Sequence, residues 1–138
     1  MSLFNIFNVA GSAMSAESVR LNTTSSNLAN ANSVSSSANE TYRARHPVFA
    51  AELDKATFGQ QDSVPVRVLG IVESEKPLVA EYDPNHPMAN AEGYIFKPNI
   101  NVVEEMANMI SASRSYQTNV QVADASKQML MRTLQMGQ

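Results

Sequence analysis

The 138-residue sequence contains no cysteine and no tryptophan, and it has little charge. The absence of cysteine excludes a disulfide framework, a thiolate metal site and a cysteine nucleophile. Charged residues make up 17% of the chain, against about a quarter in an average protein. A surface with so little charge favours contact with a protein partner. The net charge of −3 argues against a nucleic-acid partner.

Sequence patterns of catalytic and phosphate-binding sites are also missing. There is no Gly-x-Ser-x-Gly elbow, no glycine-rich phosphate loop and no apolar run long enough to span a bilayer. No Lys or Arg precedes Arg20, so we predict no cleaved signal peptide. The sequence therefore predicts no catalytic, cofactor-binding or metal-binding residues, and a protein that is not an enzyme.

The distribution of proline divides the chain into three zones. All six prolines lie between Pro47 and Pro98, whereas residues 1–46 and 99–138 contain none. Because proline disrupts helices, the two ends permit helices and the middle does not. We predict a first helix and a loop over 1–39, short strands and turns over 40–98, and a second helix over 99–138. The fold class is mainly α with a small β-rich insertion.

A row of large apolar residues repeats every seven positions in the first zone. The row predicts a helix over about 3–32, roughly 45 Å long at 1.5 Å per residue. Its polar side carries Ser, Thr and Asn in place of Glu and Lys, so the helix should be marginal alone and gain order in an assembly. Residues 33–39 are expected to be a flexible loop. The row consists of Phe7, Met14, Leu21 and Leu28.

The last zone repeats the arrangement and has a clear start. Asn101 can cap a helix, and Glu104 stands three residues later, as in a capping box. Gly137 can end the helix. The apolar positions of this helix are Met106, Met109, Tyr116, Val120 and Leu130.

The middle zone shows strand and turn patterns. Alternating valines predict a strand over 64–72, and weaker patterns predict strands over 42–53, 78–82 and 94–96. Residues 82–87 predict a turn, because two prolines and the short polar Asp83 and Asn85 favour one.

Several segments resemble the bacterial flagellar rod and hook proteins. Arg20-Leu-Asn22 followed by Ser26-Asn-Leu-Ala-Asn-Ala-Asn32 resembles their N-terminal signature, and the segments 82–94, 98–106 and 111–117 are similar to those of a proximal basal-body rod protein. The resemblance covers nearly the whole chain. One departure is Ser33-Val-Ser-Ser-Ser37, where many of these proteins have a Thr-x-Gly-Tyr turn.

The resemblance implies a structural subunit of the flagellar basal-body rod that carries torque in the periplasm. It implies export through the flagellar type III apparatus without a cleaved signal peptide. It also implies that the terminal helices pair as an antiparallel, coiled-coil-like hairpin. The expected partners are copies of the chain and other rod proteins in a helical assembly, with the membrane-ring or export-gate adaptor at the rod base. Nucleic acid, small-molecule substrates and cofactors are not expected.

Within such a hairpin, the two apolar rows should meet as a helix-pairing seam. We expect Phe7, Met14, Leu21 and Leu28 to pack against Met106, Met109, Tyr116, Val120 and Leu130. The polar face should contact neighbouring subunits through Asn22, Asn27, Asn30, Asn32 and Arg114.

Two other hypotheses account for parts of the sequence. A coiled-coil adaptor that binds a single partner predicts a helical, monodisperse dimer in dilute solution. A small metal-dependent hydrolase would use His46 and His86, the only histidines, although each precedes a proline and is typical of a turn or strand edge.

Overall fold

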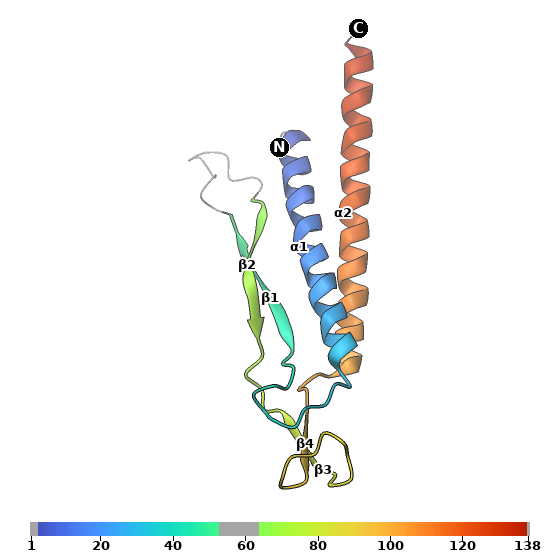
Figure 1. The fold of residues 1–138 in the computed structure, drawn as a ribbon. Coiled ribbons are helices and arrows are strands. Elements are labelled where there is room, and N and C mark those ends of the chain that lie inside the picture. Colours follow the sequence, from blue (N-terminus) through green and yellow to red (C-terminus); the bar gives the residue numbers. More distant parts are fainter. Residues whose placement is uncertain (1–2, 53–63, 138) are drawn as a thin grey trace.

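The computed structural model describes residues 3–52 and 64–137, which form two long helices and four short strands (Figure 1). The elements in chain order are α1 (Leu3–Asn30), β1 (Arg45–Ala51), β2 (Val66–Glu73), β3 (Val79–Tyr82), β4 (Tyr94–Lys97) and α2 (Val102–Met136). This arrangement confirms the mainly helical fold with a β insertion. One predicted strand, over 42–53, ends at a residue outside the described ranges.

The two helices lie side by side and run in opposite directions (Figure 1). Contacts between Arg20 and Asn108, and between Asn27 and Glu105, fix this orientation, since the later residue of α1 meets the earlier residue of α2. α2 has 35 residues against 28 in α1, and its C-terminal turns extend beyond the start of α1. Neither of these described helices is long and apolar enough to cross a membrane.

The start of α2 follows the predicted cap. Asn101 Oδ1 accepts hydrogen bonds from the backbone N–H groups of Val103, at 3.1 Å, and Glu104, at 3.4 Å. These N–H groups have no partner inside the helix, and Glu104 and Glu105 place negative charge at its positive end. The cap therefore determines where α2 begins.

The strands form two separate antiparallel pairs, β1 with β2 and β3 with β4. The register of β1–β2 shifts between Val48 and Phe49, as at a β-bulge. The pair lies along α1 on the side away from α2, so that α1 is in the middle (Figure 1). Ser12 of α1 fixes the start of β2, because its hydroxyl accepts a hydrogen bond from the Val66 N–H at 3.1 Å.

The segment between α1 and β1 is joined to the distal strand pair. Ser35 and Phe96 of β4 exchange two backbone hydrogen bonds, of 3.0 and 2.9 Å. Asn99 joins the same region to the β2–β3 turn, since its side chain accepts from the Ala44 N–H and donates to the Lys76 carbonyl. The Ser35–Phe96 bonds hold part of residues 33–39, for which the sequence predicts a flexible loop.

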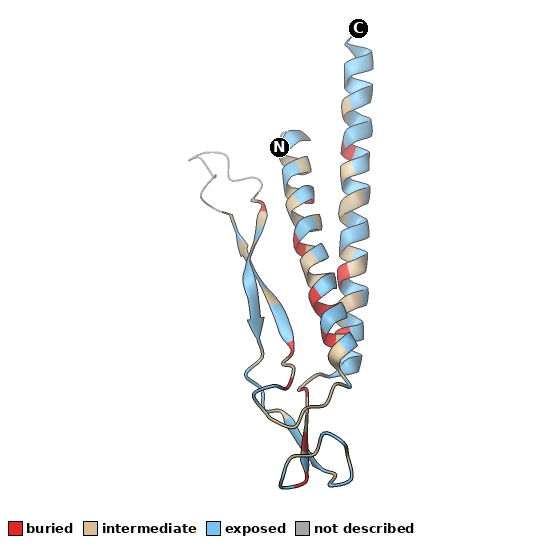
Figure 2. Cartoon of the chain, viewed as in Figure 1, coloured by how far each residue is buried: buried red, intermediate tan, exposed pale blue. Residues whose placement is uncertain are grey.

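The described residues bury very little apolar side chain (Figure 2). Their buried hydrophobic residues are Ala10, Ala16, Ala44, Ile95 and Ala112. The chain exposes 9523 Å², whereas a compact monomer of this mass exposes roughly 7,000 Å². The single subunit is thus an extended structure without a core of large apolar side chains.

Candidate helix-packing and assembly interface

The fully enclosed side chains of the two helices are small or polar. Thr23 and Ser126 satisfy their hydroxyls by donating to the Val19 and Val122 carbonyls of their own helices, at 2.7 and 2.8 Å. Small side chains let helix backbones approach closely, so this composition favours tight packing. The enclosed residues are Ala10, Ala16, Thr23, Thr24 and Asn27 on α1, and Glu105, Ala112 and Ser126 on α2.

The large apolar residues of the predicted seam lie less deeply. Met106 is 52% exposed and Tyr116 is 38% exposed. Their pairing across the helices stays a prediction. The half-buried members are Phe7, Met14, Leu21, Leu28, Met109, Val120 and Leu130.

A second row with the same spacing contains part of the enclosed residues. Ala10 and Thr24 are fourteen positions apart on α1, and Glu105, Ala112 and Ser126 follow a seven-residue spacing on α2. The seven-residue spacing was visible in the sequence. The neighbouring row was predicted as the seam because its side chains are larger and less polar.

Asn27 is the centre of a buried hydrogen-bond network. Its side chain is 0% exposed, and its amide nitrogen donates to the Arg45 carbonyl at 2.8 Å and to Glu105 Oε2 at 3.0 Å. Its amide oxygen accepts from the Arg45 N–H at 2.9 Å and from the Tyr42 hydroxyl at 3.0 Å. A primary amide offers two donor hydrogens and two acceptor lone pairs, so all four are used. One side chain therefore joins α1, the start of β1 and the start of α2.

Charged and aromatic groups surround this network on its outer side. Arg45 pairs with Glu73 at 3.0 Å, and its guanidinium lies 5.4 Å from the centre of the Tyr42 ring. Burial raises the pKa of the Tyr42 hydroxyl above 10.0, while the nearby Arg45 charge opposes the increase. The Tyr42 hydroxyl therefore stays protonated and remains a donor to Asn27 at neutral pH.

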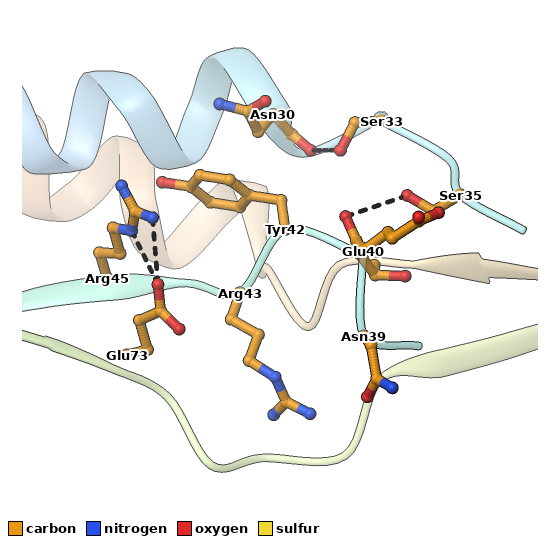
Figure 3. A pocket seen from close by; sticks show the side chains of 10 residues that line it. Asn30, Ser33, Ser35, Asn39, Glu40, Tyr42, Arg43, Arg45 and Glu73 are labelled. Carbon is orange, nitrogen blue, oxygen red and sulfur yellow. Dashed lines mark hydrogen bonds and ion pairs between the residues drawn. The ribbon is translucent and has the colours of Figure 1, made fainter. Parts of the chain in front are cut away.

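A polar hollow of about 480 Å³ lies beside these residues (Figure 3). Its lining includes the basic Arg43 and Arg45 and the acidic Glu40 and Glu73. Because the two signs are balanced, the hollow has no electrostatic preference for an anion. The described residues also contain no cluster of three or more His, Cys, Asp or Glu side chains able to hold a metal ion.

The predicted subunit-interface residues occupy different environments. Asn22, Asn32 and Arg114 are exposed, and Asn30 is half-buried with its amide donating to the Ser26 carbonyl at 2.9 Å. Asn27 lies inside the subunit, contrary to the prediction that it faces a neighbour, because all of its hydrogen-bonding groups are engaged within the chain.

Large apolar side chains gather on the outer surface instead. At the base of α2, Val103 is 77% exposed, Met106 52% and Ile110 54%. Their spacing places the three side chains on one face of the helix. The β1–β2 pair adds Leu69, Ile71 and Val72, each at least half exposed. We name Val103, Met106 and Ile110 the α2 base stripe.

Comparison with known proteins finds flagellar relatives over the full length. Residues 7–35 match the family described as "Flagella basal body rod protein", and residues 91–136 match "Flagellar basal body rod FlgEFG protein C-terminal". The chain is 46% identical over 140 residues to the flagellar basal-body rod protein FlgC of Salmonella typhimurium, and 47% identical to FlgC of Escherichia coli O157:H7, with 100% of both chains covered in each case. It is 45% identical to FlgC of Buchnera aphidicola subsp. Acyrthosiphon pisum, over 97% of each chain.

Proposed function

The chain belongs to the FlgC family of flagellar basal-body rod proteins and is a structural component of that rod, and we propose that it assembles there through its two terminal helices to transmit torque. The relatives are structural proteins and not enzymes. Family membership therefore replaces the adaptor and hydrolase hypotheses.

The single observation that carries this proposal is the lack of a core. Ile95 is the only buried hydrophobic residue larger than alanine among the described residues. Burial of a large apolar side chain stabilises a fold by about 1.5–3 kcal/mol, and this term offsets the conformational entropy lost on folding. A chain that leaves so many of these side chains in water gains this term when other subunits cover them.

The exposed apolar side chains are the surfaces that the assembly would bury. The α2 base stripe and the exposed apolar residues of the β1–β2 pair are features of the kind that mark protein interfaces. Copies of the chain would use one such surface against a different surface of a neighbour. Such heterologous contacts propagate as a helix of subunits.

The finer features of this role follow from the family resemblance. The chain would lie in the proximal, periplasmic part of the rod and leave the cell through the type III apparatus without a cleaved signal. Its neighbours would be copies of itself, other rod proteins, and the membrane-ring or export-gate adaptor at the rod base. Pairing of α1 and α2 as a coiled-coil-like hairpin would form the inner layer of the tube.

The test replaces apolar residues that the isolated subunit already exposes. In the double variant Met106→Lys with Ile110→Lys, two charges are added where water already contacts the side chains, so the single chain should fold as before. In the rod, the same charges would be buried without partners, and assembly should fail. The readouts are swimming of a strain that carries only the variant gene, and the presence of the subunit in purified basal bodies.

The matched control keeps the same positions apolar, as Met106→Leu with Ile110→Val. It should swim and assemble as the parent does. Circular dichroism of both purified variants checks that helix content is equal. If the lysine variant swims normally and enters basal bodies in parental amount, the α2 base stripe is not an assembly surface.

A further inference from the structure

The contact surfaces of the two helices contain little that fixes one helix along the other, and the segment before α2 is tethered separately through Asn99 and Phe96. Apart from Asn27 and Glu105, the enclosed residues of the helices are small, and most of them have another enclosed residue seven or fourteen positions away. A slide of one helix past the other by seven residues, about 10 Å, therefore brings similar surfaces together again. Bulky side chains that interlock would oppose the slide, but the described helix residues bury none of them fully.

Only two side-chain hydrogen bonds join α1 to α2 among the described residues, and they differ in what a slide does to them. Arg20 donates to Asn108 Oδ1 at 3.2 Å. After a seven-residue slide, Arg20 would face Ser115, whose hydroxyl also accepts hydrogen bonds. This bond therefore discriminates poorly between the two positions.

The Asn27–Glu105 bond discriminates strongly. Glu105 is 4% exposed, and its Oε2 accepts from Asn27 at 3.0 Å. The same slide would place Asn27 opposite Ala112, which has no acceptor in its side chain. It would leave the Glu105 carboxylate without the Asn27 amide, which the bonds to Arg45 hold in place. The slide would therefore leave the buried Asn27 amide without its carboxylate acceptor, and a buried donor without a partner is unfavourable.

We propose that Asn27 and Glu105 are positioning residues that fix the axial register of α1 and α2. Buried polar residues set the register of coiled coils in the same way, since each wrong alignment leaves a polar group unpaired. The inference concerns the single folded chain and does not rest on how copies assemble.

The experiment measures the register directly by pulsed electron paramagnetic resonance. The chain has no cysteine, so nitroxide labels attach only at introduced ones. Ser18→Cys on α1 and Gln128→Cys on α2 are exposed sites outside the network. The labelled full chain is diluted with excess unlabelled chain, so that distances within one molecule dominate. All samples are brought to the same helix signal with trimethylamine oxide, which favours the folded state.

Two substitutions of Glu105 distinguish the effect of losing the hydrogen-bond acceptor from the effect of losing the charge. Glu105→Gln keeps an acceptor oxygen and should retain the parental distance in a single peak. Glu105→Leu fills the site with an apolar side chain, and a second peak about 10 Å shorter should appear. Gln117→Leu, an exposed position on α2, is the control for adding leucine to that helix and should leave one peak.

A single parental peak for Glu105→Leu would overturn the proposal, and so would equal broadening in Glu105→Gln and Glu105→Leu. If Glu105→Leu does not fold, the double variant Asn27→Leu with Glu105→Leu removes both buried polar groups. A single parental peak in that variant also overturns the proposal. If the parental chain shows the normal distance distribution but does not assemble, that result contradicts the proposed function and leaves the register proposal standing.

Discussion

Replacing Asn27 with alanine should strongly destabilise the chain. The substitution removes an amide that makes four hydrogen bonds, to Arg45, Tyr42 and Glu105. Water can reach the half-buried Tyr42 and the exposed Arg45 and can replace part of what they lose. Glu105 is 4% exposed and keeps an unpaired carboxylate oxygen.

The magnitude follows from these environments. Loss of a hydrogen bond to a charged group destabilises a fold by about 1.5–3 kcal/mol, and each partly rescued neutral group adds about 1 kcal/mol or less. The total is about 3–5 kcal/mol, a large share of the roughly 5–15 kcal/mol that stabilises an ordinary domain. For a chain of this length, the melting temperature should fall by about 10–17 °C.

The assay is thermal unfolding followed by circular dichroism, in trimethylamine oxide where the parent is fully helical. Asn30→Ala is the matched control, since the Asn30 amide donates to Ser26 one turn earlier in its own helix. It should change stability by no more than about 0.5 kcal/mol. Equal melting temperatures for Asn27→Ala and Asn30→Ala would refute the importance of the network.

Three further predictions use other parts of the fold. Asn101→Ala should destabilise α2 by about 0.5–2 kcal/mol through loss of its N-cap, measured by urea unfolding. Gly93→Ala should destabilise the β3–β4 pair by about 1–3 kcal/mol, because Gly93 has φ +82° and an added Cβ would lie 2.8 Å from the Tyr82 ring. The control is Gly70→Ala, whose added Cβ meets no atom within 4 Å and which should be nearly neutral in the same assay. The pKa of Tyr42 is raised in the fold, so its contribution to stability is complete below pH 10 and is lost as pH rises through the raised value. Circular dichroism should therefore show a loss of stability above pH 10 in the parent, and Tyr42→Phe should remove this dependence.

The elements themselves were predictable because local patterns specify them. The cap at Asn101 and the long apolar rows determine the two helices, and alternating valines such as Val66 and Val68 determine a strand. The sequence-predicted turn after Tyr82 also forms, with Asp83 accepting from the Asn85 N–H. Each of these signals lies within a few residues of the structure that it produces.

The buried network was not predictable because its partners lie far apart in the chain. Nothing local distinguishes Asn27 from Asn22 or Asn30, since all three stand in the same stretch of Ser, Thr and Asn. Its difference arises from Arg45, 18 residues away, and Glu105, 78 residues away. Polarity suggested an outer face for all three, and only tertiary contact assigns Asn27 to the interior.

The contacts between α1 and α2 join residues that are synthesised far apart in time. Arg20 and Asn108 are separated by 88 residues, so a ribosome must add all of these residues before α1 meets its partner. A helix so poor in strong helix-forming residues has little to order it during that interval. α1 therefore has little to hold it in place until α2 has been synthesised and packs against it.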